Sequence, residues 1–301
     1  MGGYAVTRPL LSRIAETLYW IGRYVERADD TARLLDVSVH RMLDEPETCR
    51  SIFAVLGLSP VASVSAPAVI RRLAYDLDEP ASIAASIQSA RDSARGVREV
   101  LASEVWECLN VTWHHLSALE SQPPHAYLSF VRERAALFFG LADTSMSRDD
   151  CWRFIVLGRS LERVDMTTRL LAVHLDSDWR LLLQASGADE SFTRTHGARD
   201  GEVLEFLLLD RLFPRSVVYS LLTAEKCLRA LAPDTTRAGV ADSAQAAIGR
   251  VRAGLEYADL NELRDRLPEL LGTLQEACAA AGEAIAKRFF QHREAMAWVG
   301  A

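Results

Sequence analysis

The sequence predicts an all-α protein, a bundle of long helices built from two duplicated halves, with no β-sheet. Three observations lead to this prediction. Apolar residues recur at alternating steps of three and four over long stretches, which is the spacing of amphipathic helices. No segment shows the strict apolar and polar alternation of a β-strand. A charged segment, GRYVERADDTARLL at residues 22–35, returns as GRSLERVDMTTRLL at residues 158–171. We call these two segments the first and second cassettes.

The first half of the chain is expected to contain two long helices with two short ones between them. The first long helix begins near Leu11, and its apolar positions continue in regular steps to Met42, as in a tightly packed helix pair. Pro80 opens the second long helix, which is expected to run to about Leu119, where the segment SQPPH ends it. The two short helices are expected at residues 47–56 and 66–75.

The rest of the chain continues as helices joined by polar turns. A helix begins at Pro124 and closes at the polar DTSMSRDD turn, and the helix of the second cassette follows, with Ser147 or Asp149 as its N-cap. Residues 186–201 are expected to form a loop, because small and polar residues cluster there without periodicity. The remaining expected elements are helices at residues 202–209, from Pro214 onward and from about Ala241 with an interruption near Pro268, and a turn at residues 232–239.

The two cassettes indicate an internal duplication. They lie 136 positions apart and match at nine of their fourteen positions. Two unrelated amphipathic helices would match mainly at apolar positions, whereas here the charged residues match as well. The offset is too long for the short repeats of solenoid proteins and favours duplication of a half-domain. We therefore expect one domain over residues 1–301, with related halves at about 1–145 and 146–301.

Charge and cysteine usage exclude several classes of protein. A net charge of -7 argues against a general nucleic-acid binder, which needs a dense positive face. The five cysteines are widely spaced and include no CxxC pair, so they favour buried thiols in a reducing compartment and suggest no zinc site. No run of eighteen consecutive apolar residues is present. We expect a cytoplasmic protein that binds neither nucleic acid nor membrane.

The charged residues of the cassettes are the main candidates for a site. On a helix, Glu26, Asp29 and Arg33 fall on one arc directly beside the apolar face, where charges are partly desolvated and need partners. Gly22 and Gly158 would let another backbone or a ligand approach closely. The candidates from the cassettes are Arg23, Glu26, Arg27, Asp29 and Arg33 in the first and Arg159, Glu162, Arg163, Asp165 and Arg169 in the second.

Two further groups complete the candidate set. Arg91, Arg95 and Arg98 recur at helical spacing, and one row of arginines could face both acidic cassettes. Arg215 and Ser216 are expected in the first turn of a helix, where they could hold an anion, although ordinary capping is the favoured interpretation. For the whole cluster two interpretations stay open. It is either an interhelical salt-bridge network that sets the register of the bundle, or a polar cleft that binds an anionic ligand or a partner peptide.

Familiar catalytic signatures are absent from the sequence. It contains no GxxxxGK[ST], HExxH or GxSxG motif, and none of its seven histidines has a glutamate three positions earlier, as a di-metal four-helix site requires. We therefore expect neither a metal nor a cofactor. Paired carboxylates could still act as general acid and base, which keeps an enzyme as the second hypothesis.

The cassettes resemble the Glu-Arg motifs of the bacterial Alpha-E family, a helical domain of unknown function named for its fold and that motif. The stretch LSRIAETLYWIGRYVERADDTARLL resembles the opening helix of the family, with Glu26-Arg27 as the first Glu-Arg pair. Glu162-Arg163 matches the second pair. Two further segments with a resemblance to the family are SARGVREVLASEVWECLN, at residues 93–110, and FPRSV, which begins at residue 213.

The resemblance implies a working context and no established catalytic residue. Alpha-E proteins are typically encoded beside, and sometimes fused to, circularly permuted ATP-grasp proteins, with transglutaminase-like peptidases and a proteasome-related hydrolase as frequent neighbours. ATP-grasp enzymes join a carboxylate to an amine through an acyl-phosphate. The leading hypothesis is a helical accessory protein that binds the ATP-grasp ligase, its peptide-like anionic substrate, or both. The alternative is an enzyme of amide-bond transfer or hydrolysis that uses the cassette carboxylates.

Overall fold

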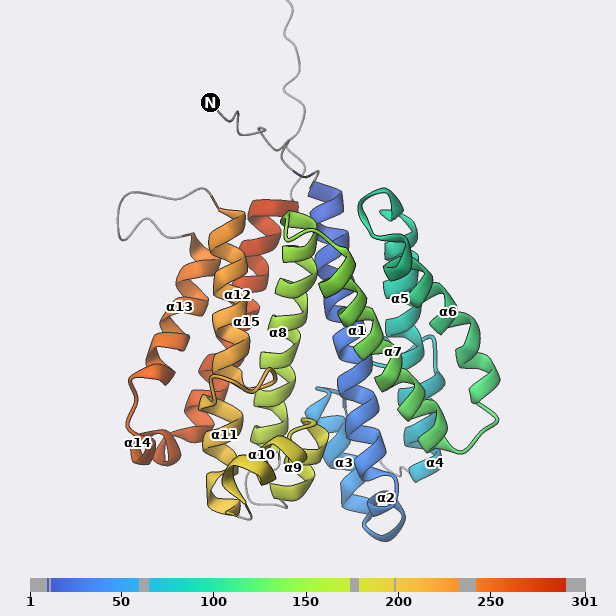
Figure 1. The fold of residues 1–301 in the computed structure, drawn as a ribbon. Helices are drawn as coiled ribbons and strands as arrows, with labels where there is room; N and C mark the ends of the chain where they lie inside the picture. The colour runs from blue at the N-terminus through green and yellow to red at the C-terminus, as the bar shows by residue number, and fades with distance from the viewer. Residues whose placement is uncertain are drawn as a thin grey trace, which may run out of the picture.

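The computed structural model describes residues 10, 12–59, 65–173, 179–197, 199–232 and 242–290. All regular elements among these residues are helical, so the prediction of an all-α fold without a β-sheet is confirmed. The helices stand side by side in a bundle, with α1 (Ser12–Ser38) and α8 (Asp150–Val173) at its centre (Figure 1). No helix in the described part of the chain is both long and apolar enough to cross a membrane.

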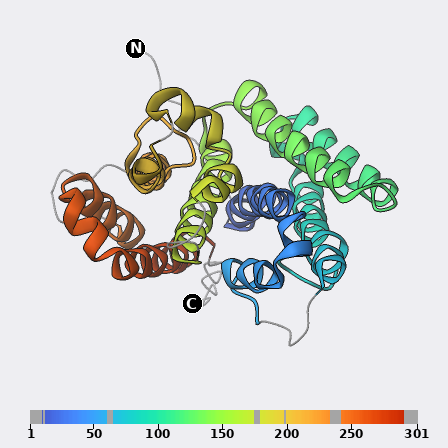
Figure 2. The same ribbon diagram turned by 90° about the horizontal axis from the view of Figure 1, so that it is seen from below.

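Helix α1 organises the first half of the bundle. It packs against α8, α5 and α7, while α6 lies against α5 and α7 on the outside (Figures 1 and 2). The longer helices of this half are α5 (Ile83–Arg95), α6 (Ser103–Leu119) and α7 (Pro124–Ser145). The shorter ones are α2 (Arg41–Asp44), α3 (Pro46–Val55) and α4 (Ala66–Ile70), which continues as a π-helical turn, Arg71–Tyr75.

Helix α8 has the same central place in the second half. It packs against α12 and α15, and α13 packs against both of those helices from the outside. The longer helices of this half are α12 (Val217–Leu231), α13 (Ser243–Glu256) and α15 (Leu267–Ile285). The shorter ones are α9 (Trp179–Ala185), α10 (Asp189–His196), α11 (Val203–Leu209) and α14 (Leu260–Asp265).

The apolar positions read from the sequence do form the core at the centre of the bundle. Leu18, Ile21 and Val25 of α1 are almost completely buried, as are Leu157 and Leu161 of α8. Each such side chain contributes roughly 1.5–3 kcal/mol through burial of its apolar surface. The first helix is shorter than expected, because it ends at Ser38 and Met42 belongs to the separate helix α2.

The helix expected from Pro80 to Leu119 is in fact two helices, so this prediction was wrong. Helix α5 ends at Arg95, a short 3-10 turn follows at Arg98–Val100, and α6 begins at Ser103. The apolar stripe continues across the break, since Val97, Leu101 and Val105 are all buried. The sequence pattern therefore stays intact although the backbone changes direction.

The loop expected at residues 186–201 contains helix α10, which is a second correction. The helix lies between two glycines with positive φ, Gly187 at 62° and Gly197 at 69°, which let the chain reverse at both ends. It presents Phe192, which is 1% exposed, to the core. One buried aromatic residue in a polar segment gives no periodicity that could have revealed the helix.

Most of the expected helix ends are found close to their predicted positions. Pro124 is the first residue of α7, and the Asp149 carboxylate accepts hydrogen bonds from the backbone N–H groups of Cys151 and Trp152, as an N-cap does. Helix α15 starts immediately before Pro268. The turn predicted at residues 232–239 lies outside the described residues, apart from its first position.

Candidate functional site

Helices α1 and α8 are in direct backbone contact at the glycines of the two cassettes. A Cβ atom added at Gly22 would overlap the carbonyl oxygen of Ile155, and one added at Gly158 would overlap the carbonyl oxygen of Tyr19. The backbone expected to approach these glycines is therefore that of the opposite cassette helix. Any larger residue at either position must push the two central helices apart.

The Glu-Arg pair of each cassette reaches across to the other cassette. Glu162 of α8 accepts hydrogen bonds from Arg23 and Arg27 of α1, the latter with 2.7 Å between Nε and Oε1. In return, Nε of Arg163 donates to Oε1 of Glu26 at 2.6 Å. Both glutamates are buried, so these are interhelical salt bridges inside the bundle.

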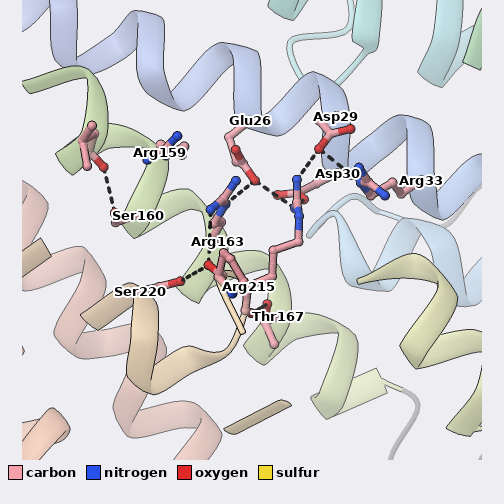
Figure 3. A network of polar contacts seen from close by, with 12 residues as sticks. Glu26, Asp29, Asp30, Arg33, Arg159, Ser160, Arg163, Thr167, Arg215 and Ser220 are labelled. Carbon is pink, nitrogen blue, oxygen red and sulfur yellow. Dashed lines mark hydrogen bonds and ion pairs between the residues drawn. The ribbon is translucent and has the colours of Figure 1, made fainter. Parts of the chain in front are cut away.

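A second arginine joins the Glu26 pair from a distant part of the chain (Figure 3). Arg215, which precedes α12, places Nη1 at 2.8 Å from Glu26 and at 2.5 Å from Asp30, and its Nη2 contacts Asp29. Arg163 also donates from Nη1 to the backbone carbonyl of Pro214, which ties this segment to α8. One arginine thus faces three buried carboxylates of α1.

The last arginine of each cassette binds its own helix and covers a turn of the chain. Arg33 pairs with Asp29, and Arg169 pairs with Asp165, both four residues apart along the helix. The Arg33 guanidinium lies against Gly187 after α9, and that of Arg169 lies against Gly57 after α3. Each central helix is thereby linked to a turn at the same end of the bundle. Both Gly187 and Gly57 have a positive φ.

The charges around the glutamates keep them ionised. Burial raises the pKa of Glu26, but the charges of Arg163 and Arg215 outweigh this effect and lower the pKa to about 2. Burial likewise raises the pKa of Glu162, and the charges of Arg23 and Arg27 reverse the shift, so that the net pKa is lowered. Both side chains are therefore carboxylates at neutral pH, each engaged by two arginines.

Asp30 is in the opposite situation. Burial and the neighbouring charges of Glu26 and Asp29 raise its pKa well above the ordinary 3.8, although the positive charge of Arg215 acts against this rise. In the described residues, Oδ2 of Asp30 is buried without a hydrogen-bond partner. Asp30 is thus the carboxyl group of the cluster that most readily binds a proton.

The arginine row after Pro80 does not supply the counter-charges that the sequence suggested. Arg91 donates to the side chain of Asn110 and pairs with Asp92, while Arg98 lies over the ring of Trp106. Arg95 is exposed. The counter-charges of the buried glutamates come instead from the cassettes themselves and from Arg215.

Arg215 and Ser216 have separate roles rather than a shared anion site. Ser216 is the N-cap of α12, where its hydroxyl accepts from the Tyr219 N–H at 3.1 Å and donates to the backbone carbonyl of Asp210. Capping, the ordinary explanation, therefore holds for Ser216. The anions that Arg215 binds are the carboxylates of α1 rather than an external ligand.

Asp30 is the member of this cluster that the candidate set omitted. It has no counterpart in the second cassette, where Met166 stands at the matching position. Arg215 has no counterpart either. The N-cap Ser216 ends the sequence Pro214-Arg215-Ser216, and the N-cap Ser82 ends the similar sequence Pro80-Ala81-Ser82, so alanine stands at the position that matches Arg215. Asp30 and Arg215 are thus two charged residues that break the repeat, and this departure is the signal by which the sequence could have pointed to Asp30.

The fold and the site define a class of protein, a helical bundle whose two central helices are joined by reciprocal Glu-Arg pairs. The family model Alpha-E, described as a predicted α-helical domain with a conserved ER motif, matches residues 10–290. The chain belongs to the Alpha-E family. The duplication of the two halves stays a prediction. The reciprocal contacts between the cassettes agree with it.

Two similar mycobacterial proteins are named only as uncharacterised. One from Mycobacterium bovis is 29% identical over 265 residues, and the similarity covers 73% of this chain and 29% of that protein. One from Mycobacterium tuberculosis is 28% identical with the same coverage. The chain thus spans less than a third of the length of these relatives. No solved structure matches it significantly.

Proposed function

We propose that this protein is a helical accessory domain that works with a circularly permuted ATP-grasp amide ligase and binds the ligase, its peptide-like anionic substrate, or both. The observation that most supports a scaffold role is the use of the Glu-Arg pairs. Glu26 and Glu162 are consumed in salt bridges between α1 and α8, inside the bundle. Residues with that role fix the packing of the two central helices, as a scaffold for a partner would require.

The acidity of the two glutamates disfavours the alternative of an enzyme that uses them as bases. A general base works best with a pKa near the working pH, which for a glutamate means a raised value. The pKa of Glu26 is about 2, and that of Glu162 is also lowered. Each carboxylate is also paired with two arginines, whose positive charges favour the ionised form over the protonated one.

The length of the relatives also supports an accessory role. Similarity to this chain accounts for 29% of the length of the mycobacterial proteins, so the similar region there is one part of a longer polypeptide. A domain that occurs within a longer chain is suited to work beside other domains.

The proposal is tested by co-expressing the tagged protein with the neighbouring ATP-grasp protein. We expect the two to purify together in a defined ratio. In the Glu26→Gln and Glu162→Gln variants, we expect complex formation and thermal stability to fall together, with the melting temperature lowered by about 5 °C or more. The matched control is Glu47→Gln, which removes an exposed ion pair with Arg50 and should change neither quantity.

Two results would decide against the scaffold role. One is the absence of any complex between the unaltered proteins. The other is a variant at Glu26 or Glu162 that keeps its melting temperature and its partner but abolishes turnover of the ligase system, because this would assign the carboxylate to chemistry.

A further inference from the structure

A positively charged pocket opens between the end of α7, α8 and α12. Its volume is about 430 Å³, which is within the usual range for sites that bind small organic molecules. Four cationic side chains line it, and Asp143 is the acid among the lining residues. The cations are Arg148, Arg153, Arg159 and Lys226.

The acids around this pocket do not balance its cations. Arg148 pairs with Asp143 at 3.0 Å, and Arg153 pairs with Asp150 at 3.0 Å. Asp143 also accepts a hydrogen bond from the indole N–H of Trp152 at 2.9 Å. Lys226 has no ion pair within the described residues. Two carboxylates therefore face four cations, and an excess of positive charge remains.

Arg159 is the most buried of these cations, and its charge is poorly compensated. Its closest carboxylate oxygen, on Asp143, is 3.9 Å away, and its Nε is buried without a hydrogen-bond partner in the described part of the chain. The guanidinium lies 4.7 Å from the centroid of the Phe139 ring, which covers one face. Figure 3 draws no contact from Arg159 to the carboxylates of α1.

The corresponding residue of the first cassette, Arg23, provides a comparison within the same molecule. The two side chains are similarly buried, with exposures of 16% for Arg23 and 14% for Arg159. Arg23 pairs with Glu162, and its pKa is raised because the charge of Glu162 outweighs burial. The pKa of Arg159 is lowered by burial and by the charge of Arg163. Two arginines with similar burial thus have pKa values that are shifted in opposite directions.

The difference coincides with an extra arginine in the Glu26 cluster. By the symmetry of the cassettes Arg159 should pair with Glu26, but Arg163 and Arg215 already bind that carboxylate. Arg159 instead lines the pocket. The N–H donors of its planar guanidinium are arranged to bind a carboxylate or a phosphate. The lining also offers an apolar and aromatic surface on Trp152 and Tyr219 for the body of a ligand.

We propose that this pocket binds a small organic anion through its carboxylate or phosphate group, with Arg159 and Lys226 as the principal ligands. This proposal rests on the proposed function, because the idea of a peptide-like anionic substrate comes from there. Cys227 also lines the pocket, but burial raises the pKa of its thiol to about 11. At neutral pH this thiol is protonated, so the pocket is expected to bind its ligand reversibly rather than covalently.

The test measures binding of two probes to the full chain by calorimetry at low ionic strength. Triglutamate carries carboxylates on a peptide, and adenosine monophosphate carries a phosphate on an aromatic body. We expect at least one probe to bind, and the identity of the tighter one to distinguish the two sources of anion. Arg159→Gln and Lys226→Gln should each weaken that binding by about tenfold or more.

The variants also separate loss of binding from loss of folding. Lys226 is exposed, so its replacement should leave the melting temperature unchanged. Arg159→Gln removes a buried charge without a close partner, and its melting temperature should equal or exceed that of the unaltered protein. Arg50→Gln is the control, because this exposed arginine does not line the pocket and should not affect binding.

The proposal would be overturned if neither probe binds, or if both variants bind as tightly as the unaltered protein. Either result would leave complex formation with the ATP-grasp protein untouched, so the failure of this proposal is distinguishable from failure of the proposed function. Binding that disappears in the Arg50→Gln control as well would point to general attraction of anions and would equally contradict the pocket.

Discussion

Replacing Gly22 by alanine should destabilise the protein by about 2–3 kcal/mol, although alanine normally favours a helix. In an open helix the same change gains up to about 1 kcal/mol, because alanine loses less backbone entropy than glycine on folding. Here the added methyl group would overlap the carbonyl oxygen of Ile155, which is backbone and can move away only if α1 and α8 separate. Separation would lengthen the salt bridges of both glutamates. Chemical denaturation monitored by circular dichroism measures the loss.

Gly140→Ala is the matched control for this prediction. Gly140 lies inside helix α7, and a Cβ atom added there has no atom within 4 Å. The substitution should therefore stabilise the protein by about 0.5–1 kcal/mol. If both glycine variants gain stability to the same extent, the two central helices are not in the close contact described here.

Replacing Arg215 by methionine should be the most damaging single change in the ion network. Its side chain is 12% exposed, and its removal leaves Glu26 with Arg163, Asp29 with Arg33, and Asp30 without an ion pair in the described residues. Loss of one partner from a buried ionic group typically costs about 3–5 kcal/mol, since the remaining charge stays desolvated. Arg229→Met, which removes an exposed arginine paired with Glu225, should cost less than about 1 kcal/mol.

The effect of Arg215→Met should depend on pH in a definite direction. The folded-state pKa of Glu26 is about 2 against an ordinary 4.5, so the stabilisation from this group is complete above pH 4.5 and is lost as the pH falls toward 2. The variant lacks part of this stabilisation and should differ most from the unaltered protein at neutral pH. The difference in unfolding free energy should shrink below about pH 4.5, as the carboxylates become protonated. A difference that grows on acidification would contradict the assignment.

The sequence revealed the helices well because periodicity reports which side of a helix is buried. It did not reveal the break between α5 and α6. Val97 and Leu101 in the connecting segment are buried, and they continue the apolar spacing of the two helices that flank it. A helix such as α10, with Phe192 as its buried aromatic anchor, leaves no pattern to detect. Burial by itself does not specify the direction of the backbone.

Most members of the candidate site were predictable, with Asp30 as the exception, but their pairings were not. Repetition of the cassettes pointed to Glu26 and Glu162 as residues that need partners, and both are indeed buried. The choice of partner depends on which helices become neighbours, and spacing along one helix does not contain this information. Arg91 was therefore assigned to the wrong acids, and the cross-pairing of the two cassettes became visible only in three dimensions.

The Glu-Arg motifs are interhelical salt bridges between the two central helices. A double-mutant cycle with Glu26→Gln and Arg163→Met measures this directly, because their side chains meet across the α1–α8 contact at 2.6 Å. We expect a coupling energy of about 1.5–3 kcal/mol in the free energy of unfolding at neutral pH. Additivity of the two single substitutions within about 0.5 kcal/mol would contradict it, since residues that do not interact behave in that way.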